Sequence, residues 1–454
     1  MPNKLIIGTA GKMSRLQKIN DLKRIDEKNW KYYVEYRAGM TSPILLEVVK
    51  DPTTQELEFV TLHEGVPKIC GWAQIGDKVI MPPSSSAGGI IKLPEMPIDY
   101  SDIKTLELDI KSFIHSWSDV SSDYEKIAAN YVMLTWVYDK FYTVPYLRAM
   151  GDFGSGKSRF LGTVGGLCYR SINIAGATPA SIYRLQNVWK GTLVWDEADL
   201  KDSTTSSDLV KVLNMGFESG HHIPRCDQNN YNNVEAFDPF GPKILGSRNI
   251  FTDNAFESRC FTEIVQPTIR NDIPQILNDE FHRTQTELRN KLLMFRLKNW
   301  PILDSDAPNK ANLGDIDPRL RQIASTLAVI IEMANPDFVD GFRSYLQSYQ
   351  DGIRSDRADT EEGMVANVIL DLRESILDDH ITYINIRTEL KSNYDLDLSP
   401  QKIGYIVKGL GINKLERIKV DGKMTKCFLS TDPILDRLAE KYGHKSCRKV
   451  GETA

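Results

Sequence analysis

The sequence predicts an α/β protein built on a parallel sheet, with a small β-rich module before the sheet and helical segments after it. Two observations carry this prediction. The stretch 151–158 matches the phosphate-binding loop pattern G-x-x-x-x-G-K-[ST] and lies between a strand-like run and a helix-like run. After it, strand-like and helix-like runs alternate, which is typical of parallel strands joined by crossover helices.

The composition is that of an ordinary globular protein, long enough for about two to four domains. Hydrophobic residues make up 41% and charged residues 26% of the 454 positions, and the net charge is −5. The charge is uneven: residues 384–449 hold fourteen Lys and Arg against eight Asp and Glu, a balance of +6, so the remainder is −11. A basic C-terminal module on an acidic body favours a local affinity for nucleic acid over a general one.

Cysteine spacing and hydropathy favour a cytoplasmic protein. The six cysteines include no C-x-x-C pair and have no histidines at ligand spacing, which disfavours a zinc site or a disulfide framework and fits a reducing compartment. The most apolar helical run, 127–138, is too short to span a bilayer, and the N-terminal apolar run is too short for a signal peptide. We therefore expect no membrane segment.

The chain before the loop divides into a β-rich part and a helical part. From residue 44, four strand-like runs separated by turns lead to a Ser- and Gly-rich linker, 82–89. Residues 99–143 predict two helices, the second capped near Ser121. The expected division is 1–95, β-rich N-terminal module; 96–143, helical region; 144–270, P-loop core; 271–350, helical lid; 351–362, linker; 363–442, winged helix; 443–454, tail.

The core is expected to alternate strands and helices from residue 144 onward. A strand enters the loop and a helix leaves it, and three further strands follow, separated by two helices. The expected strands are 144–150, 171–177, 191–200 and 242–249, and the expected helices are 158–168, 178–189 and 208–220.

The P-loop motif predicts a site for ATP and Mg²⁺. Its glycines let successive backbone N–H groups turn inward around the β- and γ-phosphates. Lys157 adds a point charge on those phosphates, and the Ser158 hydroxyl ligates Mg²⁺. The alternative is a flexible glycine turn. The expected nucleotide-binding residues are Gly151, Asp152, Phe153, Gly154, Ser155, Gly156, Lys157 and Ser158.

The strand expected at 191–200 carries Asp196 and Glu197 toward the edge of the sheet where ligands bind. Asp196 is placed to hold Mg²⁺ through water, and Glu197 to polarise the attacking water. The alternative is two loop carboxylates that simply follow a core strand.

Three further residues are candidates for catalysis. Asn249 follows the fourth strand, where a side-chain amide could orient the attacking water. Arg259 could stabilise charge on the transferred phosphoryl group across a subunit boundary, or it could be a surface arginine paired with Glu257. Arg319 and Arg321, at a helix that starts with proline, could reach the γ-phosphate, or they could be a solvated helix terminus.

In this order, the motifs resemble those of an AAA+ ATPase. The stretch is similar to the MCM-like and superfamily-three-like replicative helicases of plasmids, phages and mobile elements, over residues 140–335. Ser258-Arg259-Cys260 is similar to the Ser-Arg-Phe arginine-finger motif of MCM proteins, and 320–323 to their sensor-two helix, which favours Arg321 over Arg319. The resemblance implies self-association into a ring, probable hexamers in that family, with single-stranded DNA in the channel.

The same resemblance implies a hairpin before the fourth strand that points into the channel. The matching stretch, 221–236, has strand-like arms around an Asn-rich tip, and it lacks the lysine usual at that tip. Tyr231 could stack on a base and Arg225 could pair with a phosphate. The alternative is an ordinary surface hairpin. His221 and His222 have no further ligands at metal spacing.

The C-terminal module predicts a winged helix that contacts duplex DNA. Three helices and a two-stranded hairpin around an Asp-Gly turn fit that motif. The alternative is a winged helix that contacts only proteins. The residues expected to contact DNA, all on the third helix or the wing, are Gln401, Lys402, Tyr405, Lys408, Arg417, Lys419, Lys423 and Lys426.

Together these features predict a ring-forming, ATP-driven DNA helicase or translocase, acting in replication of a mobile element. An AAA+ initiator or loader that remodels DNA without unwinding it is the enzymatic alternative. A winged-helix DNA-binding protein with a nucleotide switch is the non-enzymatic alternative. Strand displacement separates the first from the other two, and ATP turnover separates the second from the third.

Overall fold

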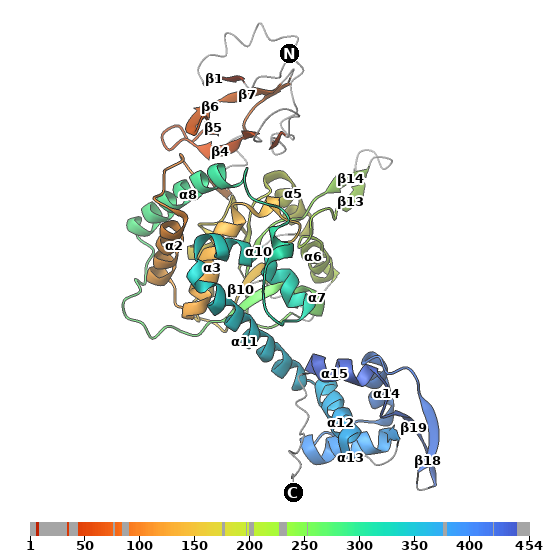
Figure 1. Cartoon of the computed structure of the whole chain (residues 1–454). Helices are drawn as coiled ribbons and strands as arrows, with labels where there is room; N and C mark the ends of the chain where they lie inside the picture. Colours follow the sequence, from red (N-terminus) through yellow and green to blue (C-terminus); the bar gives the residue numbers. More distant parts are fainter. Residues whose placement is uncertain are drawn as a thin grey trace. The chain divides into compact units, whose positions relative to one another are not determined.

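The computed structural model describes residues 6–8, 34–35, 44–75, 78–83, 90–174, 178–196, 198, 204–226, 234–251, 253–375, 379–420 and 422–442. The chain divides into two units, Met1–Arg343 and Ser344–Ala454 (Figure 1). None of the described helices is long and apolar enough to cross a membrane.

The first unit is centred on a six-stranded sheet whose order is β16-β10-β15-β12-β11-β9. The first five strands of that order run parallel, and β9 pairs antiparallel with β11 at the edge. The predicted α/β class with a parallel sheet is confirmed. The strands are β9 (Ile91–Lys92), β10 (Tyr146–Met150), β11 (Ser171–Ile174), β12 (Leu193–Trp195), β15 (Lys243–Ser247) and β16 (Cys260–Ile264).

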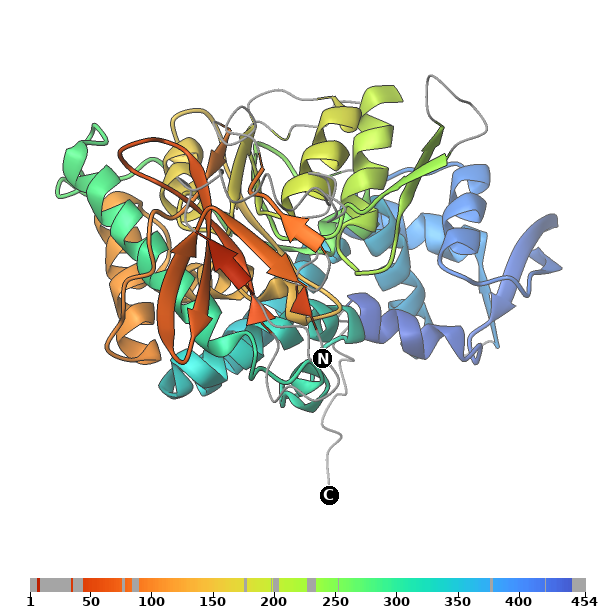
Figure 2. The ribbon, with the colours of Figure 1, turned by 90° about the horizontal axis from the view of Figure 1, so that it is seen from above.

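Helices cover both faces of this sheet (Figures 1 and 2). On one face, η4 packs against Val194 of β12, and α3 lies beside α4, with the rings of Tyr124 and Phe160 5.7 Å apart. On the other face, the Tyr146 hydroxyl of β10 donates to the Leu213 carbonyl of α6 (2.6 Å). These helices are α3 (Ser122–Thr135), α4 (Lys157–Phe160), the π-turn η4 (Leu161–Gly165), α5 (Pro179–Trp189), α6 (Thr204–Met215) and α7 (Asn254–Glu257).

The helices that precede the P-loop pack with those that follow the sheet. Helix α2 contacts α3 and α8, and α10 contacts both α3 and α2, so segments far apart in the sequence form one bundle. In Figure 2, α2 (orange) and α8 (green) lie together on one side of the unit. The remaining helices here are α2 (Ile103–Trp117), η3 (Tyr138–Lys140), α8 (Asp279–Asn299), α9 (Ala307–Lys310), α10 (Pro318–Ala334) and η5 (Pro336–Phe338).

The N-terminal part is β-rich, as predicted, and its described strands form three small antiparallel sheets. The main one, β4-β5-β6, buries Val48, Phe59 and Val60. The strands are β1 (Ile6–Gly8), β2 (Val34–Glu35), β3 (Ile44–Leu45), β4 (Glu47–Lys50), β5 (Leu57–His63), β6 (Val66–Cys70), β7 (Trp72–Ile75) and β8 (Lys78–Ile80).

A buried ionic network ties this β-rich part to the part of the unit that holds the six-stranded sheet. The Glu47 carboxylate, 2% exposed, accepts hydrogen bonds from Arg170 (2.8 Å), Arg296 (2.6 Å) and the Tyr169 hydroxyl (2.8 Å). Arg296 also binds Asp139 through two hydrogen bonds of 2.8 and 2.7 Å. Burial would raise the pKa of Glu47 and of Asp139, but Arg296 beside both carboxyls leaves each pKa below its ordinary value.

This network predicts a loss of stability in acid. Both carboxyls bind protons less readily in the folded state, so their contribution is complete above their ordinary pKa values and is lost as the pH falls through the lowered ones. Glu47→Gln should lower the free energy of unfolding by about 3–5 kcal/mol at pH 7 and flatten the acid limb of the stability profile. Urea unfolding at several pH values measures both effects. The exposed control Glu56→Gln should match wild type, and an unchanged acid limb in Glu47→Gln would contradict the assignment.

A hairpin is inserted between α6 and β15, as the resemblance implied. Its arms are β13 (Ile223–Cys226) and β14 (Val234–Phe237). Lys243, 1% exposed at the start of β15, holds both ends of the insertion. Its ammonium donates to the carbonyls of Gly216 (3.2 Å), Pro239 (3.3 Å) and Gly241 (2.8 Å). Burial lowers the pKa of Lys243 to about 7, and the three carbonyls match the three N–H donors of the ammonium.

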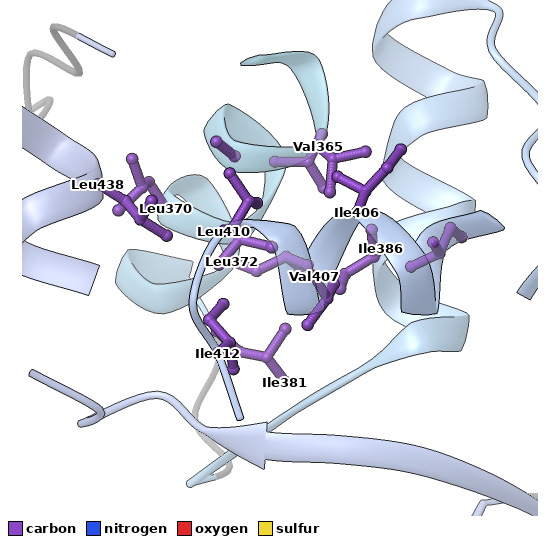
Figure 3. Close-up of a cluster of buried hydrophobic side chains, with 14 of the residues drawn as sticks. Val365, Leu370, Leu372, Ile381, Ile386, Ile406, Val407, Leu410, Ile412 and Leu438 are labelled. Atoms are coloured by element: carbon purple, nitrogen blue, oxygen red, sulfur yellow. The ribbon is translucent and has the colours of Figure 1, made fainter. Parts of the chain in front are cut away.

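The second unit has its own hydrophobic core. Side chains from four helices and two strands meet there, including Val365 of α12, Ile386 of α13, Ile406 of α14, Leu438 of α15 and Ile381 of β17 (Figure 3). Strands β17, β19 and β18 form an antiparallel sheet in that order. The elements are α12 (Glu361–Ser375), β17 (His380–Thr382), α13 (Tyr383–Tyr394), α14 (Pro400–Gly409), β18 (Glu416–Val420), β19 (Lys423–Leu429) and α15 (Ile434–Tyr442).

The segment 351–362, expected to be a linker, is largely helical. Helix α11 (Val339–Ala358) runs through most of it, and α12 begins at Glu361. The polar composition suggested a linker, but Gln, Arg, Asp and Ser without proline are compatible with an exposed helix. The division between the two units falls earlier, after Arg343.

Candidate nucleotide-binding site

The stretch 151–158 connects β10 to α4 by a loop that depends on three glycines. Gly154 and Gly156 have φ values of +73° and +96°, which L side chains rarely adopt. A Cβ on Gly151 would lie 2.4 Å from the Val265 carbonyl oxygen, so alanine cannot fit there without movement. The spacing of glycines in the motif therefore corresponds to a tight loop that side chains would obstruct.

Polar groups inside this loop suit an anionic ligand. The Lys157 ammonium lies within it and donates to the carbonyls of Gly151 (2.6 Å) and Asp152 (2.7 Å). The Ser155 hydroxyl is buried and has no hydrogen-bond partner among the described residues. A confined ammonium beside an unsatisfied buried hydroxyl fits a phosphate group, which would accept hydrogen bonds from both.

A cavity of about 730 Å³ opens from the loop, a volume suited to a nucleotide. One wall of the cavity is the segment 268–275, for which no role was predicted because it carries no motif. Contacts between the walls hold the cavity: Arg159 donates to the Gln275 carbonyl (2.5 Å) and Thr268 donates to Asp119 (2.6 Å). The cavity residues are Ser118, Asp119, Phe153, Gly154, Ser155, Gly156, Lys157, Ser158, Arg159, Asp196, Arg248, Thr268, Arg270, Asn271, Ile273, Pro274 and Gln275.

Asp196 lies at the carboxyl end of β12 and lines the cavity together with Ser158. Its Oδ1 would be 3.0 Å from a Cβ on Gly246 of the neighbouring strand, so the carboxylate lies directly over that glycine. A hydroxyl and one carboxylate fit Mg²⁺, which keeps several waters and binds phosphate oxygens as well. The described residues contain no cluster of three or more His, Cys, Asp or Glu side chains suited to a metal ion. Glu197 lies outside the described residues.

At the end of β15, the structure brings Arg248 rather than Asn249 to the cavity. Arg248 lines it, and its guanidinium carbon lies 3.8 Å from the centroid of the Phe153 ring. Asn249 is exposed and is not among the lining residues, and its carbonyl accepts a hydrogen bond from Ser247 (3.1 Å). No role was predicted for Arg248, although it is the penultimate residue of the expected strand 242–249.

Arg259 and Arg319 lie together around Phe217. Their guanidinium carbons are 5.3 and 4.9 Å from the centroid of that ring, and Arg319 donates to the Ser258 hydroxyl (3.1 Å). Burial, and then the charge of Arg259, lower the pKa of Arg319. Arg259 donates to the Ala255 carbonyl one turn earlier. Two like charges held this close would be stabilised by an anion.

The sequence favoured Arg321 for this role, and the structure places it elsewhere. Arg321 is exposed and donates to the Gly314 carbonyl (2.7 Å). The alternative for Arg259, a pair with Glu257, is not formed either, because Glu257 binds the buried Arg148 of β10 (2.7 Å). The N-terminal turn of α10 therefore presents Arg319, two residues before the residue that was expected.

The arginine pair and the P-loop lie at opposite ends of the same strand. Tyr146, the first residue of β10, donates its backbone N–H to the Arg259 carbonyl (2.9 Å), whereas the P-loop begins after Met150, the last residue of β10. Five residues of parallel strand span roughly 13–17 Å. The pair therefore lies at the edge of the sheet opposite the P-loop of its own chain.

No protein-family model matches the chain, and no curated protein matches it. Several solved structures are similar. The C-terminal region of NrS-1 has 12% identity and a TM-score of 0.38 over 85% of this chain and 96% of that one. The active SCCmec type IV Cch helicase has 12% identity and a TM-score of 0.41 over 89% of this chain and 95% of that one. The Aeropyrum pernix ORC2 protein has 12% identity and a TM-score of 0.21 over 71% and 92%.

Of the two hairpin residues expected to contact DNA, Arg225 lies among the described residues and Tyr231 does not. Arg225 is exposed on β13, with its guanidinium carbon 5.4 Å from the ring centroid of Tyr183 on α5. It lies directly opposite Glu235 of β14 in the register of the hairpin. Tyr231 and the rest of the tip lie outside the described residues.

In the second unit, α14 presents one polar face. Ile403, Ile406 and Val407 are buried, whereas Gln401, Lys402, Tyr405 and Lys408 are exposed. Lys402 is paired with Glu361 of α12 (2.6 Å). The expected contact residues that are exposed are Gln401, Lys402, Tyr405, Lys408, Arg417, Lys419 and Lys426; the side chain of Lys423 lies outside the described part.

Proposed function

We propose that this protein is an AAA+ ATPase that assembles into a ring and uses ATP and Mg²⁺ to translocate along DNA and unwind it, in the replication of a mobile element. One observation carries the proposal: Arg259 and Arg319 lie together at the end of the sheet opposite the P-loop. Arginines placed there reach a phosphoryl group only on another copy of the chain, which makes a ring of head-to-tail copies the natural assembly.

Each residue of the site has a distinct role in phosphoryl transfer. Lys157 and the loop backbone would hold the phosphates, and Ser158 with Asp196 would hold Mg²⁺, whose charge would offset that of the phosphate oxygens. Glu197 takes a proton from the attacking water. The neighbouring copy's arginine pair stabilises the charge on the transferred group, so hydrolysis requires a closed interface.

Strand displacement tests this proposal directly. The full-length protein, a forked duplex with one labelled strand, ATP and Mg²⁺ should release the labelled strand, and Glu197→Gln protein should not. ATP turnover without strand release would favour the loader, and nucleotide binding without turnover would favour the switch. Negative-stain images with an ATP analogue and DNA should show rings.

The proposal that the second unit acts as a winged helix gives a prediction for duplex binding. It concerns Lys408 of α14 and Lys419 of β18, which are both exposed. Replacing both Lys408 and Lys419 by Gln should weaken duplex binding about tenfold at 0.15 M salt and lower the salt slope by about two, because two phosphate contacts are lost. Fluorescence anisotropy across a salt series measures both quantities. Lys441→Gln, an exposed lysine of α15, is the control and should bind as wild type. Unchanged affinity and slope in the double variant would place the DNA contact elsewhere.

A further inference from the structure

If the cavity binds ATP as proposed above, the chain just after β15 supplies a further contact to the nucleotide. Of the cations lining the cavity, Arg159 and Arg270 hold the walls together. Arg159 donates to the Gln275 carbonyl (2.5 Å), and Arg270 binds Asp272 (2.6 Å) and the His115 carbonyl (3.0 Å). Arg248 reaches the same cavity from the end of the central strand β15.

Arg248 directly follows Ser247, the last residue of β15, and lines the cavity with the P-loop residues. The end of the strand lies close to that loop and to Asp196. A Cβ on Gly246 would lie 2.8 Å from Leu161 of η4 and 3.0 Å from the Asp196 Oδ1. Asn249, one residue further, is exposed and is not among the lining residues.

Phe153 holds Arg248 against the P-loop. It is 72% exposed, and the Arg248 guanidinium carbon lies 3.8 Å from its ring centroid. Such a contact contributes about 0.5–1 kcal/mol at an exposed site. Stacking uses the flat face of the guanidinium, while its N–H groups donate in the plane of the group, where a phosphate oxygen accepts them.

We propose that Arg248, and not Asn249, is the residue after β15 that contacts the γ-phosphate, and that Phe153 is the positioning residue that holds its guanidinium over the loop. The cation adds to the charge of Lys157 in the same cavity, which Asp196 also lines. The site thereby distinguishes ATP from ADP, because only ATP carries the group that Arg248 contacts.

Nucleotide affinity tests the proposal without relying on turnover. The Kd values of a non-hydrolysable ATP analogue and of ADP, each with Mg²⁺, are measured on the full-length protein by calorimetry. Arg248→Ala should weaken binding of the ATP analogue about tenfold or more and that of ADP less than about threefold, as expected for a charge-assisted hydrogen bond to one phosphate. Phe153→Leu should show a smaller loss with the same selectivity. Arg283→Ala, an exposed arginine of α8 outside the cavity, is the matched control.

The outcomes separate this proposal from the proposed function. If wild-type protein binds neither nucleotide, the ATP site itself is wrong and this inference falls with it. If wild type binds both and Arg248→Ala changes the two affinities equally or not at all, only the assignment of Arg248 is overturned. A selective loss in Asn249→Ala with none in Arg248→Ala would restore the residue favoured by the sequence. An unchanged melting temperature in the variants excludes unfolding as the cause.

Discussion

Replacing Lys157 by alanine should reduce ATP hydrolysis by about 10²–10³-fold or more, because the confined ammonium is the principal positive charge inside the loop. The same change should weaken binding of ATP and ADP together, since Lys157 lies at the loop and not at one end of the cavity. Steady-state phosphate release and equilibrium binding of each nucleotide measure the two effects.

Two controls make this result specific. Lys211→Ala removes an exposed lysine of α6 that pairs with Asp208 in the same helix, and it should hydrolyse ATP as wild type does. Glu197→Gln should retain nucleotide binding while losing turnover, because it removes only the base that polarises water. Turnover near the wild-type rate in Lys157→Ala would show that the loop does not bind phosphate for catalysis.

The second large effect is expected for Arg259. Arg259→Ala should bind ATP normally and lose about 10³-fold in turnover, because the missing charge belongs to the neighbour's site. Mixing it with Lys157→Ala protein should restore activity. In a random equimolar ring, about a quarter of the head-to-tail interfaces join an intact P-loop to an intact Arg259. ATPase rate across mixing ratios, after confirmed subunit exchange, measures the recovery.

A structural role for Arg259 predicts a different pattern. The variant would then fail to assemble or fold, which size-exclusion chromatography detects, and no mixing ratio would restore turnover. Arg319→Ala should behave in the mixture as Arg259→Ala does, because the two side chains share the Phe217 ring. Arg321→Ala should remain active by itself, since its side chain binds the Gly314 carbonyl away from that ring.

The sequence predicted most of the elements because they depend on local patterns. The glycine spacing of the loop, the alternation of strands and helices, and the amphipathic period of α14 each lie within a few neighbouring residues. The α/β class with a parallel sheet followed from these patterns and is confirmed.

Two kinds of feature were not predicted from the sequence. One is the direction in which a particular side chain points, and the other is a contact between residues far apart in the chain. Arg248 and Asn249 are neighbours just after β15, and only Arg248 lines the cavity, which depends on how the chain turns as it leaves the strand. Arg319 and Arg321 differ by two, which on a helix turns the side chain by more than half a circle. Glu47 meets Arg296, almost 250 positions later, and no local pattern can reveal such a contact.

Lys243 hydrogen-bonds to both ends of the inserted hairpin, and this affects which changes in the hairpin sequence the fold can accept. The Gly241 N–H donates to the Gly216 carbonyl (3.2 Å), so the two points where the chain leaves and rejoins the core are already in contact. Replacing strands β13 and β14 by a hairpin of another length therefore adds little to the entropic cost of closing the loop, and it leaves the six-stranded sheet unchanged. This position is open to grafting: a hairpin with a different tip can be substituted while Gly216, Gly241 and Lys243 preserve the attachment.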